Sequence, residues 1–322
     1  MDHLLEIQQL SKFYGKFLAL DRLDLTVKKG QIIGFLGPNG SGKTTTIKII
    51  GGLLTQYSGK VIYKNKESKH IGNKKECKFV FDNQNFYENL TAYENLIIIS
   101  RLNHNFNRKK MLSALEKIGL GGWENIPVKK FSRGMKQRLA IASSELIIPE
   151  FLVLDEPTNG LDIQGISSLE SYFKDLNKNY GTTILLSSHY LEQVQRLSDH
   201  IVIIYKGKKI FDGDYTDFSK ESRIGVRYVF RDNIASSGTE NLEKTIKNDT
   251  VIRNLGLSVN KVNLSGSVLD VFMDNFAFSE DKQCVLNRQI TTIIDSNPII
   301  FIYPLEKELK DFFREEVSTQ NN

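Results

Sequence analysis

The stretch from Gly37 to Thr44 constrains the fold of this 322-residue chain more than any other part of it. It reads Gly-Pro-Asn-Gly-Ser-Gly-Lys-Thr and lies between an apolar run at 31–36 and a helical pattern at 44–54. Glycines let successive backbone N–H groups converge on a phosphate, and the following helix N-terminus adds partial positive charge. The pattern G-x-x-x-x-G-K-[ST] therefore predicts a strand, a phosphate-binding loop and a helix, in that order.

Within this loop, two side chains have expected roles in holding a nucleoside triphosphate. Lys43 is expected to reach the β- and γ-phosphates, and the Thr44 hydroxyl is expected to bind Mg²⁺. The residues predicted to bind nucleotide here are Gly37, Pro38, Asn39, Gly40, Ser41, Gly42, Lys43, Thr44 and Thr45. A guanine-specific N-K-x-D pattern is not predicted, because the nearest match, at 65–68, has serine in its fourth position.

A second motif, Phe-Leu-Val-Leu-Asp-Glu at 151–156, fits the same chemistry. Its apolar part predicts a buried strand that delivers Asp155 at the carboxyl end, where open α/β sheets bind their ligands. Asp155 is expected to hold Mg²⁺ through water. Glu156 is expected to polarise the attacking water as a general base.

The rest of the first two thirds alternates between strand and helix patterns, which predicts an α/β fold with a mainly parallel sheet. Predicted strands lie at 31–36, 78–81, 151–154, 182–186 and 201–204, and predicted helices at 44–54, 91–102, 109–118, 134–147, 166–179 and 191–197. Short antiparallel strands are expected at 4–8, 20–27 and 60–63, with turns at Lys29-Gly30 and Ser58-Gly59. After residue 214 the pattern weakens to a small α+β region that ends in an amphipathic helix over 305–317.

Charge and composition support a boundary near residue 215. Residues from 215 onward carry 13 Lys and Arg against 16 Asp and Glu, while the preceding part carries 30 against 22. A basic first part suits nucleotide phosphates, and would also suit nucleic acid or an anionic membrane surface. The acidic N-terminus, the lack of an 18-residue apolar run and two distant cysteines predict a cytosolic chain without a disulfide or a Cys/His metal site.

The segment Phe131–Leu139, FSRGMKQRL, precedes Asp155 by about 20 residues. The order of P-loop, S-x-G-x-K-Q-R, D-E-P, N-G-L-D and a histidine after a strand resembles the ATP-binding cassette of ABC transporters over residues 1 to about 212. The form SRGMKQRL resembles the branch that drives drug, lantibiotic, polysaccharide and sodium exporters. The resemblance implies a P-loop NTPase cassette over 1–214, with a parallel sheet core, an antiparallel β subdomain and a helical subdomain at about 83–148. The small α+β extension at 215–322 is expected to serve in dimerisation or regulation.

The resemblance also implies a site shared by two cassettes that close head to tail on two ATP molecules. Ser132 and the Gly134 N–H would clamp the γ-phosphate held by the partner. Asp162 is the usual carboxylate of the loop that links Glu156 to the partner site. His189 matches the switch histidine that contacts the γ-phosphate and steadies the general base.

The resemblance implies roles for two further positions, and at each of them a neighbouring residue is an alternative. Tyr14 matches the aromatic that stacks on adenine, with Phe13 as the alternative. The loop that usually offers a glutamine to Mg²⁺ has Asp82 at the matching position, while Gln84 lies two residues later. Asp82 can serve as a hard-oxygen metal ligand. Two further departures from the family pattern lie in the signature, where Arg133 replaces the first glycine and Met135 replaces the glutamine.

Taken together, the resemblance implies an ATP-hydrolysing exporter subunit with ATP and Mg²⁺ as cofactors. Its expected partners are a second cassette, as homodimer or heterodimer, and a separate permease at the cytoplasmic face of the cell membrane; no nucleic-acid partner is expected. Two alternatives stay open: a soluble ABC ATPase acting on ribosomes or DNA, and a non-hydrolysing regulatory cassette. The first alternative is disfavoured because the chain has one cassette and no heptad run. The resemblance implies that the membrane partner selects the exported substrate.

Overall fold

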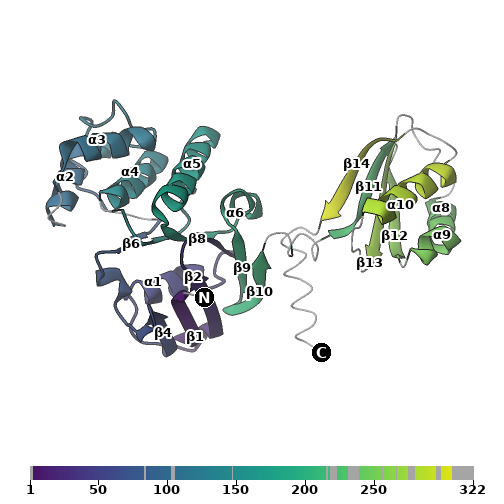
Figure 1. The fold of residues 1–322 in the computed structure, drawn as a ribbon, viewed down its shortest axis with the longest axis horizontal. Helices are drawn as coiled ribbons and strands as arrows, with labels where there is room; N and C mark the ends of the chain where they lie inside the picture. The colour runs from purple at the N-terminus through teal and green to yellow at the C-terminus, as the bar shows by residue number, and fades with distance from the viewer. Residues whose placement is uncertain are drawn as a thin grey trace. The chain divides into compact units, whose positions relative to one another are not determined.

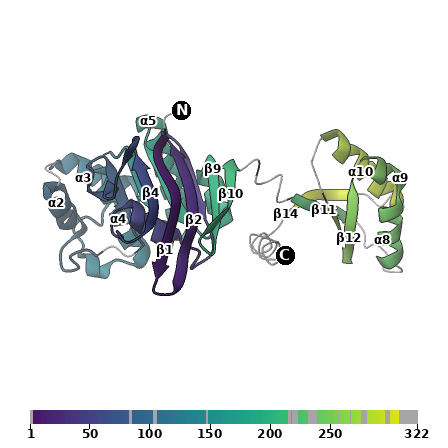
Figure 2. The same ribbon diagram turned by 90° about the horizontal axis from the view of Figure 1, so that it is seen from below.

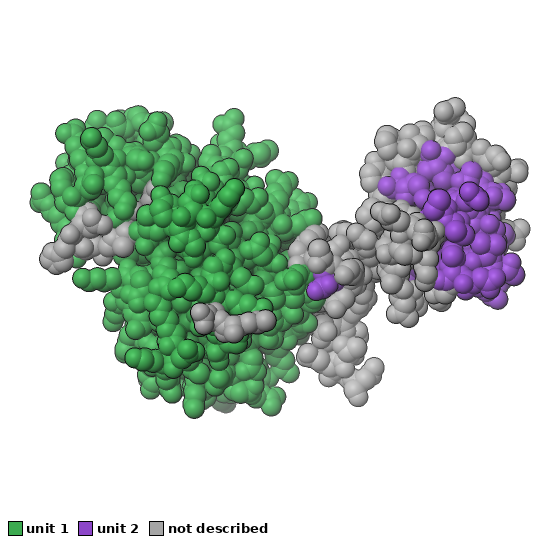
Figure 3. Space-filling view, viewed as in Figure 1, with its two compact units in different colours: residues 1–215 green, residues 216–322 purple. Residues whose placement is uncertain are grey.

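The computed structural model describes residues 3–82, 85–102, 106–146, 148–214, 217, 223–230, 239–255, 257–265, 267–274, 280–294 and 299–306. The chain divides into two compact units, residues 1–215 and 216–322 (Figure 3). Each unit has a hydrophobic core of its own.

A six-stranded sheet forms the centre of the first unit, in the order β10-β9-β3-β8-β7-β6. Its strands are β3 (Ile32–Leu36), β6 (Cys77–Val80), β7 (Phe151–Leu154), β8 (Thr183–Ser188), β9 (His200–Tyr205) and β10 (Lys208–Asp214). Neighbours from β9 to β6 pair in parallel, and only β10 is antiparallel to its neighbour. Every side chain of β3, β7 and β8 is buried, as expected for parallel strands covered on both faces. The predicted α/β fold with a mainly parallel sheet is confirmed.

A second, antiparallel sheet runs in the order β2-β1-β4-β5, with β1 at His3–Tyr14, β2 at Phe17–Lys28, β4 at Ser58–Tyr63 and β5 at Lys66–Glu67. The strands β1 and β2 are the longest in this unit and lie side by side (Figure 2). The predicted turn at Ser58-Gly59 is wrong, because both residues belong to β4. Gly59 has φ +97°, and a Cβ there would lie 2.5 Å from the carbonyl oxygens of Gln8 and Gln9, so this glycine fits an irregularity in the strand pairing.

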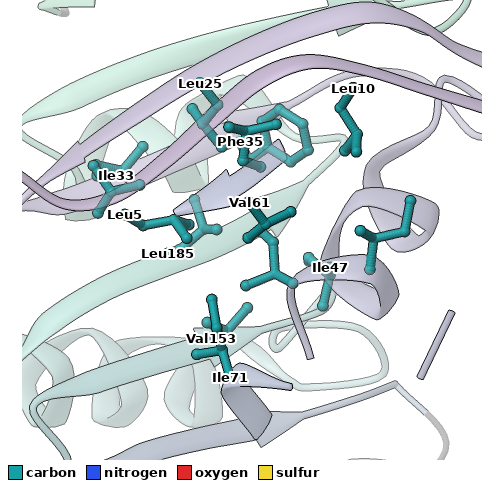
Figure 4. Close-up of a cluster of buried hydrophobic side chains, with 14 of the residues drawn as sticks. Leu5, Leu10, Leu25, Ile33, Phe35, Ile47, Val61, Ile71, Val153 and Leu185 are labelled. Atoms are coloured by element: carbon teal, nitrogen blue, oxygen red, sulfur yellow. The ribbon is translucent and has the colours of Figure 1, made fainter. Parts of the chain in front are cut away.

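The core of the first unit joins the two sheets and α1 (Lys43–Ile50). Apolar side chains from both sheets and from α1 meet there, including Leu5, Leu25, Phe35, Ile47, Val153 and Leu185 (Figure 4). The helix α1 is shorter than the predicted 44–54, because Gly51 caps it and Gly52 follows with φ +77°. The strand β3 is buried along its whole length. This packing holds in place the end of β3 from which the phosphate-binding loop begins.

Several helices surround the central sheet. The helices α5 (Ile163–Tyr180) and α6 (Leu191–Leu197) contact β8, and α6 also contacts β3. Between β6 and β7 the chain forms α2 (Ala92–Leu102), α3 (Arg108–Lys117), the 3-10 turn η2 (Val128–Lys130) and α4 (Arg133–Glu145). The helices α2, α3 and α4 gather at the end of this unit away from β9 and β10 (Figures 1 and 2). A short 3-10 turn, η1 (Ile71–Asn73), precedes β6.

The second unit is an antiparallel sheet with helices. Its elements follow as β11 (Arg223–Phe230), α8 (Thr239–Asn248), α9 (Thr250–Asn254), β12 (Ser258–Ser265), β13 (Val268–Asp274), α10 (Glu280–Ile293) and β14 (Ile299–Glu306). The strand order β12-β13-β11-β14, with antiparallel neighbours, is that of the ferredoxin-like split βαβ motif. The predicted helix over 305–317 is wrong at its start, because Leu305 and Glu306 belong to β14; its remaining residues lie outside those described.

In the described parts of both units, no helix combines the length and the apolar character needed to cross a membrane.

Candidate active site

The site lies at one edge of the central sheet, where four adjacent parallel strands end. The P-loop follows β3, His189 follows β8, Asp155 follows β7, and Asp82 follows β6. Because parallel strands share one carboxyl edge, residues more than 100 positions apart in the chain meet there. A pocket of about 480 Å³ lies at this edge.

The pocket brings together residues from several of the predicted motifs. Its lining consists of Tyr14, Phe17, Ala19, Asn39, Gly40, Gly42, Lys43, Thr44, Thr45, Asp82, Arg133, Asp155, Glu156, Asn159 and His189. Six predicted residues do not line it within this chain: Gly37, Pro38, Ser41, Ser132, Gly134 and Asp162. Gln84 lies outside the described residues, so the structure describes Asp82 but not its alternative.

The P-loop conformation requires its glycines. Gly40 has φ +79° and Gly42, at the N-cap of α1, has φ +111°, a region that side-chain-bearing residues rarely adopt. A Cβ on Gly37 would lie 2.3 Å from the carbonyl oxygen of Ile204. The hydroxyl of Ser41 is buried and has no hydrogen-bond partner in the structure. The loop is thus a close-packed cradle of backbone, as phosphate binding requires.

Lys43 lies within this cradle and is 5% exposed. Its ammonium donates to the carbonyl oxygens of Gly37, at 2.7 Å, and Pro38, at 3.2 Å. It also lies 3.2 Å from Oε1 of Glu156. This buried cation holds the P-loop and the second motif together and offers a charge to an incoming phosphate.

Glu156 is held from three sides. Its carboxylate pairs with Lys43 and, through Oε2, with Nδ1 of His189 at 2.9 Å. Its backbone N–H donates to Oγ of Ser187 at 3.0 Å. The residue has φ +50°, a strained conformation for a side chain of this kind, and such strain is concentrated at functional sites. The orientation of the carboxylate is therefore fixed by Lys43 and His189. A fixed orientation is what a general base needs.

Asp155 is buried behind Glu156 and contacts two hydroxyl groups. Its Oδ1 accepts a hydrogen bond from Ser187 at 2.7 Å and one from Thr44 at 3.2 Å. Burial raises the pKa of the Asp155 carboxyl above its ordinary value, and the hydrogen bonds from Ser187 and Thr44 oppose that rise. Among the described residues no group of three His, Cys, Asp or Glu side chains is placed to hold a metal alone. A hydroxyl and a carboxylate oxygen are the donors that Mg²⁺ takes when phosphates complete its shell, so Thr44 and Asp155 fit that ion.

The signature segment lies at the start of α4. Ser132 caps this helix, since its Oγ accepts from the N–H of Met135 at 3.2 Å. A Cβ on Gly134 would lie 2.5 Å from the carbonyl oxygen of Gly160, so this glycine lets α4 pack on the loop that follows Glu156. Asp162 likewise caps α5 by accepting from the N–H of Gly165 at 2.9 Å.

Three aromatic residues lie near the end of the β1–β2 pair. Tyr14 and Phe17 are paired across the strands, both are substantially exposed, and both line the pocket. Phe13 is exposed but does not line it, so the geometry favours Tyr14 over Phe13. Phe17, Ser187 and Asn159 were not predicted as site residues. Strand pairing could have identified Phe17 and Ser187. Phe17 lies opposite Tyr14, and Ser187 follows the residue that pairs with Leu154.

Known proteins share this arrangement. A sequence profile of the ABC transporter family matches residues 20–159. The lantibiotic transport ATP-binding protein SrtF of Streptococcus pyogenes is 40% identical over 212 residues, which are 66% of this chain and 91% of that protein. The chain belongs to the ATP-binding subunits of ABC transporters.

Other relatives and solved structures agree with this assignment. The bacitracin transport ATP-binding protein BcrA of Enterococcus faecalis is 34% identical over 272 residues, covering 82% of this chain and 88% of that protein. The dimeric ATP-binding cassette MJ0796, in a post-hydrolysis state bound to ADP and Pi, has a TM-score of 0.58 at 25% identity and covers 65% of this chain and 98% of that one. Another ABC transporter ATP-binding subunit has a TM-score of 0.60 at 27% identity, over 68% of this chain and 92% of that one. This chain is an ABC cassette that binds ATP and an ATPase of the transporter class.

Proposed function

We propose that this chain powers an ABC exporter by binding Mg·ATP, closing against a second cassette and hydrolysing the nucleotide. The observation that carries the proposal is the Lys43–Glu156–His189 constellation, in which a buried cation and a histidine hold one carboxylate at the mouth of the P-loop. A phosphate cradle and an oriented base at the same edge of the sheet are the parts that phosphoryl transfer to water needs.

In this mechanism the P-loop amides and Lys43 hold the β- and γ-phosphates. Thr44 and Asp155 would hold Mg²⁺, which would supply positive charge to offset the negative charge of the phosphates. Glu156 takes the proton of the attacking water, and His189 keeps the carboxylate oriented by its contact with Oε2. Lys43 must leave its P-loop carbonyls or share its protons with phosphate oxygens when ATP binds.

A single chain supplies only part of the proposed pocket. Ser132 and Gly134 lie at a helix N-terminus but outside the pocket that contains Lys43. Their proposed role is at the ATP of a second cassette, where the hydroxyl and the N–H would contact the γ-phosphate. The dimeric cassette structure named above supports this arrangement. A homodimer and a heterodimer are both compatible with it.

We further propose that the cassette acts at the cytoplasmic face of the membrane, bound to a separate permease. The names of SrtF and BcrA support export, and make peptide antibiotics the first cargo class to test. They also favour transport over a ribosome or DNA role. Residues 215–322, whose described strands have the ferredoxin-like order, are proposed to serve in dimerisation or regulation.

The test is Mg²⁺-dependent ATP hydrolysis by the purified chain, followed by co-purification with its membrane partner in mild detergent. The proposal expects turnover that rises more steeply than linearly with protein concentration, since two chains form each site. It also expects the chain to pellet with membranes only when the permease is co-expressed. A chain that fails to hydrolyse ATP, or that pellets with ribosomes instead, would overturn it.

A further inference from the structure

Two of the three positions at which the sequence departs from the ABC pattern contact each other. Arg133 replaces the first glycine of the signature, and Asp82 occupies the position usually held by glutamine. The guanidinium Nη2 of Arg133 donates to both carboxylate oxygens of Asp82, at 2.8 and 2.7 Å. These residues are 51 positions apart, one after β6 and one in the first turn of α4.

The pair lies at the edge of the nucleotide pocket rather than on a remote surface. Both residues line the pocket that contains Lys43 and Glu156, and both line a neighbouring hollow of about 460 Å³. They therefore form part of the wall between the two. The Asp82 side chain is 29% exposed and that of Arg133 is 60% exposed, so solvent reaches both members of the pair.

Arg133 also lies next to the loop that follows Glu156. A Cβ added to Gly160 would meet the Arg133 side chain at 3.4 to 3.7 Å, so the apolar stem of Arg133 lies beside this glycine. The adjacent Gly134 packs on the carbonyl oxygen of Gly160. Arg133 thus begins the signature helix, pairs with Asp82 after β6 and lies beside the loop that follows Glu156.

We infer that Arg133 and Asp82 act as one positioning pair, which sets the signature helix α4 against the loop behind Glu156. This inference rests on the proposed function. It assigns the Asp82 carboxylate to Arg133 rather than to Mg²⁺, and it explains both departures as halves of one contact. Hydrogen bonds from a planar guanidinium to a carboxylate are directional, so the pair fixes orientation as well as distance.

The test is a double-mutant cycle on steady-state ATP hydrolysis by the full chain, with Asp82→Asn, Arg133→Met and the double variant. Each single variant is expected to lower kcat by about three- to tenfold, the range of coupled contacting pairs. The double variant is expected to be no slower than either single one, with little change in KM because the P-loop is untouched. Asp82→Glu and Arg133→Lys, which keep the charges, are expected to recover part of the rate.

A matched control lies away from the site. Lys64 pairs with Glu150 at 2.6 Å, and neither residue lines the nucleotide pocket or the neighbouring hollow. Lys64→Met is therefore expected to leave kcat unchanged, and thermal unfolding of all variants reports whether the fold survives.

Three outcomes would overturn the inference. If the effects of the two substitutions simply multiply, or change ATP affinity in opposite directions, the residues act only through their separate charges. If Asp82→Asn alone abolishes Mg²⁺ dependence while Arg133→Met is active, Asp82 is a metal ligand. If Arg133→Met turns over at the wild-type rate, the pair is dispensable. A wild-type chain without ATPase activity would instead refute the proposed function itself.

Discussion

Ser187 is expected to be the most sensitive residue of the site that does not itself contact nucleotide. It is fully buried, donates to Oδ1 of Asp155 at 2.7 Å and accepts the N–H of Glu156 at 3.0 Å. Replacing it with alanine removes a hydrogen bond to a buried carboxylate and leaves a buried N–H without its acceptor. Each loss costs about 1–3 kcal/mol, and entry of water at a polar site recovers part of that. Ser187→Ala is therefore expected to lower the free energy of unfolding by about 2–3 kcal/mol.

The same substitution has an expected pH signature. The pKa of Asp155 is already raised by burial, and the Ser187 hydroxyl opposes that rise. Without the hydroxyl, the pKa of Asp155 rises further, because the charged form loses a donor. A carboxyl with a raised folded-state pKa loses stability as pH rises through that pKa. The destabilisation by Ser187→Ala is therefore larger at neutral pH than in acid, and ATP turnover at neutral pH falls with it.

The assay is urea unfolding followed by tryptophan fluorescence. Trp123 is the single tryptophan of the chain and lies in the first unit, so its signal reports the cassette alone. Ser144→Ala is the matched control, because Ser144 is also buried but donates to the backbone carbonyl of Ile141 in its own helix. Such back-bonded hydroxyls contribute little to stability. Equal unfolding energies for the two variants would refute the proposed bridging role of Ser187.

Two further substitutions test the packing of the signature and the titration of His200. Gly134→Ala is expected to lower ATP turnover at least tenfold, because the added Cβ would push α4 away from the Gly160 carbonyl. Gly121→Ala is the control and is expected to leave turnover unchanged, because its Cβ would meet nothing closer than 3.7 Å. Equal activities of the two variants would contradict this. Hydrogen bonds to Asp212 and Asp214 raise the pKa of His200. The stability it contributes is full below about pH 6.5 and is lost as pH rises through the raised pKa, so His200→Gln should flatten unfolding energies measured between pH 6 and 9.

The sequence correctly predicted those helices and strands whose bounds follow from their own apolar pattern. The strand over 151–154 and the helix over 191–197 have the predicted bounds, and the P-loop follows β3 as its motif requires. The helix α1 ended early because Gly51 and Gly52 outweigh the apolar pattern beyond them. The predicted turn at Gly59 failed because glycine also serves at irregular positions within strands.

The site was harder to predict where it depends on strand register or long-range pairing. Which of two neighbouring serines faces Asp155 is decided by the pairing of β8 with β7, which places Ser187 one residue beyond the partner of Leu154. Asp82 and Arg133 contact each other although they are 51 positions apart in the chain. No local sequence pattern predicts such a contact. The motifs predict which residues carry the chemistry, whereas the residues that hold them in place follow from the tertiary fold.

The most direct test of the account is the association state of the Glu156→Gln variant with ATP, measured by light scattering together with the nucleotide content per chain. Removing the base while keeping the shape of the side chain should stop hydrolysis and leave ATP trapped. The account predicts a stable dimer with one ATP per chain, in contrast to monomeric wild type after turnover. A variant that stays monomeric while hydrolysing ATP at the wild-type rate would contradict both the assigned base and the shared site.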